Sequence, residues 1–166
     1  DEAPFSSLKE ITTWAAGLGY KGVQIPTYDA RLFNLKQAAD SQDYCDEIKG
    51  ICYESGVEIT ELSSHLQGQL VAVNPAYDLA FDAFAPPEVH GNPQGRQEWA
   101  VNQMEKVAVA SRRLGLDHTV SFSGSLAFPF LYPWPQRPEG LIEESFSELA
   151  RRWIPIFDFY NDNGVD

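Results

Sequence analysis

The sequence predicts an α/β fold in which parallel strands are joined by helices. Two observations predict it. An amphipathic helix that ends at a glycine and is followed by a short β-rich run occurs repeatedly along the chain. The β-rich runs mix apolar with polar residues and are not continuously apolar. A barrel and a doubly wound open sheet both produce such patterns, and 166 residues are enough for one domain with its own core.

The first of these units is a helix over residues 8–18 followed by a strand over 23–25. Ser7 and Glu10 fit a capping box, which specifies the start of the helix. Gly19 suits the left-handed position that closes a helix. The unit therefore has a defined start and a defined end.

Three more units follow the same order. They are helix 41–55 with strand 57–62, helix 92–114 with strand 118–122, and helix 141–161 before Gly164-Val165-Asp166. Pro155 lies inside the last helix and predicts a kink or a break there. The chain begins with a helix and reaches residues 164–166 where a further strand is expected to begin, so we expect residues 1–166 to form a single, incomplete domain with unpaired sheet edges.

The balance of charge is strongly acidic, with 24 Asp and Glu against 12 Lys and Arg. Such a surface repels phosphate backbones, so nucleic acid is not an expected partner. No apolar run has the length of a membrane span, and we expect no membrane partner. Cys45 and Cys52 lie on one predicted helix, roughly 10 Å apart along its axis, too far for a disulfide. Free thiols favour a reducing, cytoplasmic location.

In parallel α/β barrels the active site lies at the carboxyl ends of the strands. His65 follows the second visible strand directly, and it could bind a metal, contact a sugar oxygen or carry a proton; alternatively, neighbouring backbone groups satisfy it. Gln67 and Gln69 each offer a donor and an acceptor, as a polyhydroxylated ligand requires, or they are surface amides. Gln24, within the first strand, and Ser123, after the third, complete the substrate-binding candidates near strand ends.

Two further candidates come from the aromatic, proline-rich segment 129–135 and the residues after it. Trp134 could form an apolar platform for a sugar ring, or it packs in the core. Arg137 could hold a phosphate or a carboxylate, or it is a surface arginine. No P-loop, nucleophile elbow or zinc-protease motif occurs in the sequence.

Three segments carry a likeness to a known family: 14–26 (WAAGLGYKGVQIP), 56–70 (GVEITELSSHLQGQL) and 128–138 (FPFLYPWPQRP). They resemble the sugar phosphate isomerase/epimerase family, which belongs to the xylose isomerase-like barrel superfamily together with endonuclease IV. The resemblance covers nearly the whole chain. It implies a partial (β/α)8 TIM barrel, roughly the N-terminal half, with strands two to four and their flanking helices.

The resemblance also implies a chemistry. Members of the family hold a divalent metal (Mn, Mg, Co or Zn) with Glu, Asp, His and Glu from later strands, and they isomerise or epimerise sugars through an enediolate. None of those four ligands aligns with this chain, so we expect no metal ligand here and a divalent metal in the full-length protein. His65 matches the family's strand-three histidine and is the one catalytic candidate carried over. Gln24 stands where relatives place a polar strand-two residue.

Three functions follow as hypotheses. The first is a metal-dependent sugar or sugar phosphate isomerase or epimerase, whose partner is a small-molecule sugar. The second is a metal-dependent abasic-site endonuclease, against which the acidic charge argues. The third is a non-catalytic half-barrel that assembles with another chain, either as a homo-oligomer or with the missing C-terminal half.

Overall fold

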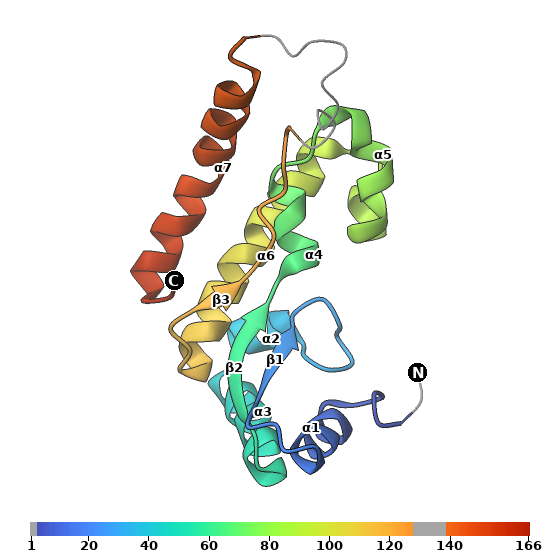
Figure 1. Ribbon diagram of the computed structural model, residues 1–166, viewed down its shortest axis with the longest axis vertical. Helices are drawn as coiled ribbons and strands as arrows, with labels where there is room; N and C mark the ends of the chain where they lie inside the picture. The colour runs from blue at the N-terminus through green and yellow to red at the C-terminus, as the bar shows by residue number, and fades with distance from the viewer. Residues whose placement is uncertain (1–2, 128–138) are drawn as a thin grey trace. The chain divides into compact units, whose positions relative to one another are not determined.

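The computed structural model describes residues 3–127 and 139–166 (Figure 1). Its strands form one parallel sheet in the order β1 (Gly22–Pro26), β2 (Glu58–Ser63) and β3 (Thr119–Val120). Helices separate these strands along the chain, so each parallel connection is a helical crossover. The predicted α/β fold is therefore confirmed, and it has the architecture of a partial TIM barrel.

The helices include every long one that the sequence predicts. They are α1 (Leu8–Gly17), α2 (Leu35–Asp40), α3 (Gln42–Ser55), α4 (His65–Gly68), α5 (Asp78–Phe81), α6 (Pro93–Leu114) and α7 (Leu141–Asn163). Short 3-10 turns lie between α4 and α6: η1 (Gln69–Val71), η2 (Pro75–Tyr77), η3 (Asp82–Phe84) and η4 (Pro87–Val89). The long connection before α6 is thus a series of short helical turns.

Within the described part, the chain divides into two compact units. The first unit comprises Asp1–Ser64, Lys106–Val120 and Tyr160–Asp166, and the second comprises His65–Glu105 and Ser121–Phe159. The first unit holds the sheet, and the second holds the short helical turns. The single domain over 1–166 stays a prediction, and each unit is described on its own below.

Helix ends in the first unit follow the capping signals of the sequence. The Ser7 side chain accepts a hydrogen bond from the backbone N–H of Glu10, 3.3 Å away. Ser41 caps α3 by accepting from the N–H of Tyr44 at 3.2 Å, and Gly56 ends that helix with a left-handed φ of 81°. These contacts satisfy backbone groups that a helix terminus leaves unpaired.

The β1–β2 ladder contains an irregularity that decides which side chains meet. Val23 pairs with Ile59, but Gln24 pairs with Glu61, so Thr60 is the extra residue. Such a bulge re-aims side chains in a strand. It places the Gln24 amide opposite the Glu61 carboxylate, where the two bond.

A further parallel pairing flanks β3. The N–H of Asp166 donates to the carbonyl of Asp117 at 2.7 Å, and the Asp166 carbonyl accepts from the N–H of Thr119 at 2.9 Å. This alternation of bonds to the residues on either side of His118 is the pattern of a parallel ladder. Residue 166 therefore begins a pairing beside β3, as the sequence predicts for the next strand.

Two features differ from the predictions, the length of β3 and the continuity of α7 at Pro155. The strand predicted over 118–122 is shorter in the structure, where β3 covers Thr119–Val120, and farther along the chain Val73 and Ser125 form an isolated parallel bridge. The predicted break at Pro155 does not occur, since α7 is one helix. Trp153 and Ile156 beside Pro155 are buried, and this packing offsets a proline cost of about 3 kcal/mol.

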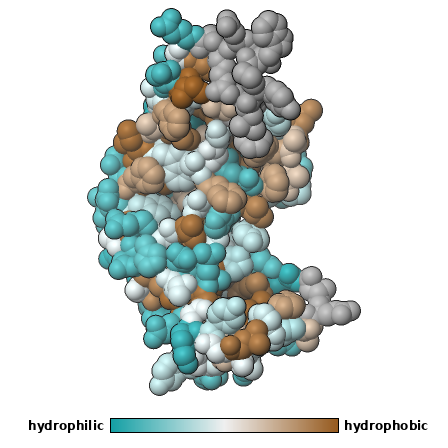
Figure 2. Space-filling view, viewed as in Figure 1, coloured by the Kyte–Doolittle hydropathy of each residue, from teal (hydrophilic) through white to brown (hydrophobic). Residues whose placement is uncertain are grey.

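The surface is mixed in character. On the face shown in Figure 2, hydrophilic and hydrophobic residues are interspersed. No helix of residues 3–127 or 139–166 is both long enough and apolar enough to span a membrane.

Both cysteines are free, as the helical spacing predicts, and both are buried in the first unit. The Cys45 thiol donates to the carbonyl of Ala38 at 3.3 Å. Burial raises the pKa of Cys45 and raises the pKa of Cys52 to about 11. At neutral pH both groups are therefore thiols, which are poor nucleophiles.

We expect a thiol reagent that releases a coloured aromatic thiolate to label neither Cys45 nor Cys52 in the native chain at about pH 8. Both thiols are buried and protonated there. In denaturant both thiols should react within minutes. The absorbance of the released thiolate measures the reaction. Rapid native labelling would contradict the burial of this helix face, and a Cys45→Ser variant assigns any signal to one of the two thiols.

Candidate functional site

The second unit contains a cleft of about 410 Å³. Amide and hydroxyl side chains at its wall come from Gln69, Asn74, Ser123 and Ser125, and aromatic rings come from Tyr77, Phe81 and Phe122. Small-molecule sites fall in this range of volume, and they combine apolar and aromatic walls with a few polar groups. The cleft is therefore the candidate binding site of the second unit.

Close backbone packing builds one wall of the cleft. A Cβ on Gly124 would lie 2.4 Å from the carbonyl oxygen of Ala72 and 2.5 Å from that of Gln69. Gly124 also has a φ of 71°, which is left-handed. Only glycine suits both conditions. The close approach brings the segment of Ser123 against the segment of Gln69.

Two hydrogen bonds fix the same wall. The Asn74 side-chain amide donates to the carbonyl of Leu126 at 2.7 Å. The buried indole of Trp153, on α7, donates to the carbonyl of Ser123 at 2.9 Å. Donors that are shielded from water need a partner, so these two part-buried bonds hold the 123–126 segment in one position.

His65 is the first residue of α4 and is half-buried. Its imidazole packs edge-on against the ring of Phe122, with 4.3 Å between the ring centroids and 81° between the planes. Phe122 lines the cleft. The structure therefore places the catalytic candidate in contact with a wall residue of the cleft, and its role stays a prediction.

The structure separates the other candidates from the sequence into four groups, of which Gln24 is the last. Gln69 and Ser123 line the cleft together. Gln67 is only 3% exposed, so its amide lies in the interior and is not among the lining residues. Trp134 and Arg137 lie outside the described residues, and their predicted roles stay predictions.

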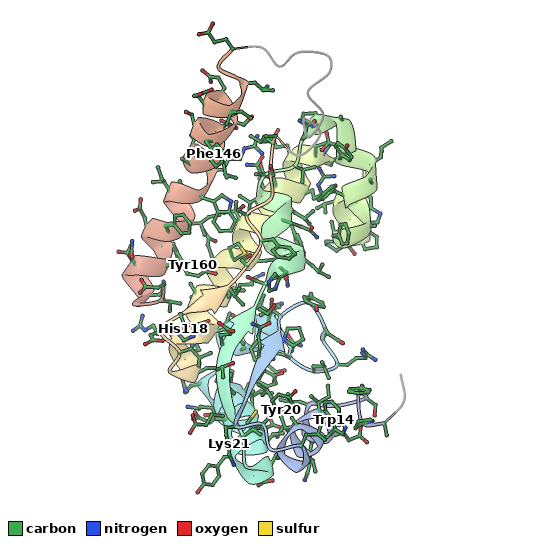
Figure 3. All side chains as sticks on the ribbon, in the orientation of Figure 1. Trp14, Tyr20, Lys21, His118, Phe146 and Tyr160 are labelled. Carbon is green, nitrogen blue, oxygen red and sulfur yellow. The ribbon has the colours of Figure 1, made fainter. Side chains whose placement is uncertain are left out.

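Gln24 belongs to the first unit and has a different environment. Its side-chain amide donates to Glu61 Oε1 at 2.7 Å, across the bulged β1–β2 ladder. The other oxygen of Glu61 lies 3.7 Å from His118 Nε2. His118, directly before β3 (Figure 3), also contacts Asp117 through Nδ1 at 2.6 Å. Gln24 is therefore part of a polar cluster on the sheet.

Acidic neighbours dominate the electrostatics of this cluster. The hydrogen bond to Asp117, with the charges of Asp117, Glu61 and Asp166, raises the pKa of His118. The same hydrogen bond lowers the pKa of Asp117. The pKa of His118 in the folded chain lies above the unfolded value near 6.5. Protonated His118 therefore stabilises the fold at pH values below the unfolded pKa, and this stabilisation is lost as pH rises through the folded pKa.

We expect an NMR titration of the His118 ring protons to give a pKa above the ordinary value, and Asp117→Asn to lower it, because the substitution removes the largest stabilising contact. Asp43→Asn, an exposed carboxylate on α3, serves as the control and should leave the pKa unchanged. An ordinary pKa in the native chain would contradict the paired geometry.

Asn74, Tyr77 and Phe81 line the cleft but are not among the residues predicted from the sequence. A usable signal was present. Tyr77 and Phe81 are four residues apart just after Pro75, which is the spacing of one face of a helical segment. A short helix that starts at a proline and carries aromatic residues at this spacing indicates a packed wall rather than a solvent-exposed loop.

Within the ranges that the structure describes, no three His, Cys, Asp or Glu side chains come together in a way that could hold a metal ion. The cleft wall offers amides, hydroxyls and rings. Divalent metals of this class take carboxylate and imidazole ligands. The amides, hydroxyls and rings of the cleft are instead groups of the kind found in sites for organic ligands.

Comparison with known proteins identifies the class. A model of the xylose isomerase-like TIM barrel family matches residues 13–166. The chain belongs to this family, which includes sugar isomerases, sugar epimerases and abasic-site endonucleases. The resemblance carried by the sequence segments and the predicted partial TIM barrel are thus confirmed.

Among solved structures, the chain is similar to a xylose isomerase domain protein from Planctomyces limnophilus. The identity is 14%, the TM-score is 0.47, and the match covers 87% of this chain and 51% of that chain. The chain therefore spans about half the length of that protein. No curated protein matches the sequence.

Proposed function

We propose that this chain supplies the N-terminal half of a metal-dependent sugar or sugar phosphate isomerase or epimerase, and that the cleft of the second unit contacts the sugar. The observation that carries the proposal is that Gln69, Ser123 and three aromatic rings line the same cavity of about 410 Å³. Family membership supports the reaction class. A cytoplasmic location is part of the same proposal.

The groups of the cleft suit a polyhydroxylated ligand. The side-chain amide of Gln69, which donates one N–H to the Leu66 carbonyl at 3.4 Å, keeps a second N–H donor and a carbonyl acceptor, which match the donor and acceptor character of sugar hydroxyls. The Asn74 amide donates to the Leu126 carbonyl and accepts from the Ala76 N–H, so it contributes its second N–H. The rings take the apolar C–H faces of the sugar. In this proposal His65 orients a sugar oxygen or carries a proton to or from it, and its ring contact with Phe122, a wall residue, supports that role.

The proposal keeps a divalent metal (Mn, Mg, Co or Zn) as the cofactor of the whole protein, where it stabilises negative charge that develops on the substrate. Gln69, Ser123 and the aromatic wall act at the binding stage. Binding that orients the sugar accounts for a large part of enzymatic rate enhancement, because it removes translational and rotational freedom before the reaction.

The test is turnover by the full-length protein with each metal in turn. A panel of aldoses, ketoses and their phosphates is incubated in heavy water, and NMR detects both product and exchange of the carbon-bound proton. The proposal expects isomerised or epimerised product with at least one sugar. Gln69→Ala should raise KM, and Tyr53→Ala, an exposed change on α3, is the control. Absence of both product and exchange across the panel would overturn the reaction class.

One observation favours a second function, assembly of a half-barrel with another chain or with a second copy. Asp166 continues the sheet beside β3, and within the described residues no strand pairs with the outer edge of β1. An uncovered edge is a site for pairing. Native mass spectrometry of the 166-residue chain should then show a dimer or a larger species. A stable monomer at micromolar concentration would contradict assembly.

The nuclease branch of the family remains the alternative enzyme class. A formal net charge of −12 opposes binding to a phosphate backbone. We therefore expect no incision of an abasic-site duplex by the full-length protein with metal, and incision at low enzyme concentration would reverse this choice.

A further inference from the structure

The aromatic wall of the cleft stands on one continuous helical segment. Tyr77 ends η2, and Phe81 ends α5, which leads directly into η3. Tyr77 and Phe81 are four positions apart in the chain, and both side chains line the cleft. The ring of Phe81 also packs edge-on against Phe84, 5.7 Å between centroids.

The adjacent face of this segment is held by one buried arginine. Asp78 and Asp82, each one residue after a wall residue, both contact the guanidinium of Arg96 on α6. Arg96 is 2% exposed. Its Nη1 donates to the Asp78 carbonyl at 2.6 Å and to Asp82 Oδ1 at 2.8 Å, and its Nη2 donates to Asp78 Oδ1.

We call Arg96 with its partners Asp78 and Asp82 the clamp. A further hydrogen bond fixes the Asp82 side chain. The second oxygen of Asp82 accepts from the backbone N–H of Gly91 at 2.8 Å. A planar guanidinium that bonds two carboxylates and a carbonyl fixes orientation as well as distance. The segment 77–82 thus presents one face to Arg96 and the next face to the cleft, so the position of the rings depends on the clamp.

We infer that Tyr77 and Phe81 determine which ligand the cleft accepts, and that Arg96 is the positioning residue that sets their rings. The inference rests on the proposed sugar site and names its preference. A ring-form sugar presents a rigid C–H face to an aromatic wall, whereas an open-chain polyol loses conformational entropy to do the same. A wall fixed before binding therefore favours the ring form.

The test compares two probes on the 166-residue chain, methyl β-D-xylopyranoside as the locked ring and xylitol as the open chain. Isothermal titration or NMR gives a Kd for each, and the readout is the ratio of the two constants. The wild-type chain should prefer the ring. Tyr77→Leu and Phe81→Leu should each reduce that ratio by about fivefold, because leucine keeps apolar bulk but not a flat face. Leu79→Ala, an 84% exposed change on the same short helix, should leave the ratio unchanged.

Arg96 is tested by two further variants. Arg96→Gln should lose the preference, and Arg96→Lys should restore part of it, since lysine keeps the charge without the planar fork. A general loss of structure would weaken both probes alike, whereas a positioning role changes their ratio. If an Arg96 variant does not fold, Tyr77→Leu and Phe81→Leu alone decide whether the aromatic wall sets the preference for the ring form.

The outcomes separate this inference from the proposed function. Binding of both probes with a ratio that no variant changes would overturn the inference and leave the sugar site standing. Failure of the wild-type chain to bind either probe would overturn both.

Discussion

Substitution of Gly124 by alanine is expected to lower the free energy of unfolding by about 3 kcal/mol and to abolish sugar binding. A Cβ at this position would lie 2.4 Å from the Ala72 carbonyl oxygen and 2.5 Å from that of Gln69, and neither backbone group can rotate away. The left-handed φ of 71° adds strain for any other residue. Chemical denaturation measures the stability, and probe titration measures the binding.

Gly19→Ala is the control. Gly19 also has a left-handed φ, of 90°, but a Cβ there would meet nothing within 4 Å. The control therefore isolates backbone strain, which costs about 1 kcal/mol, from the steric clash at Gly124. Equal losses of stability for Gly124→Ala and Gly19→Ala would contradict the close packing of the cleft wall.

Replacement of His65 is expected to have the largest effect on turnover. In the full-length protein with metal, His65→Ala should lower kcat/KM for the sugar by about 100-fold or more, the usual range for a residue that carries a proton or orients a reacting oxygen. Steady-state kinetics on the sugar identified by the turnover panel measures the effect. We expect this large effect because His65 packs against Phe122, a wall residue of the cleft.

His65→Phe separates chemistry from packing. Phenylalanine keeps an aromatic ring for the edge-on contact with Phe122 but has no nitrogen. Both variants should lose activity to a similar degree if the imidazole acts on the substrate. Retention of activity by His65→Phe would show that the residue supports the wall and has no role in proton transfer.

Much of the fold could be predicted because local chemistry specifies it. Ser7 and Gly19 carry the predicted capping signals, since Ser7 caps the start of α1 and Gly19, just after that helix, has a left-handed φ of 90°. The alternation of helices and short strands correctly indicated parallel pairing. The bulge beside Gln24 could not be predicted, because register depends on which strands pair and not on the strand itself.

The site was less accessible from sequence. Gln69 and Ser123 follow strand ends, a position that general rules of barrels indicate, and the structure brings them to one cleft. Gln67 lies beside Gln69 in the chain but is buried, since neighbouring residues of a helical turn point in different directions. Tyr77 and Phe81 have the spacing of one helical face, but the ion pairs that Arg96 makes with Asp78 and Asp82 beside them could not be predicted. Long-range ion pairs of this kind leave no periodic signal.

The central claim is that the cleft of the second unit binds a sugar, and a single NMR titration tests it. Methyl β-D-xylopyranoside is added to the isotopically labelled 166-residue chain, and amide shifts are followed. The expected result is saturable shifts in the side-chain amides of Gln69 and Asn74 and in the backbone amides of Ser123 and Ser125. Unchanged shifts at these four residues with saturating probe would contradict the claim.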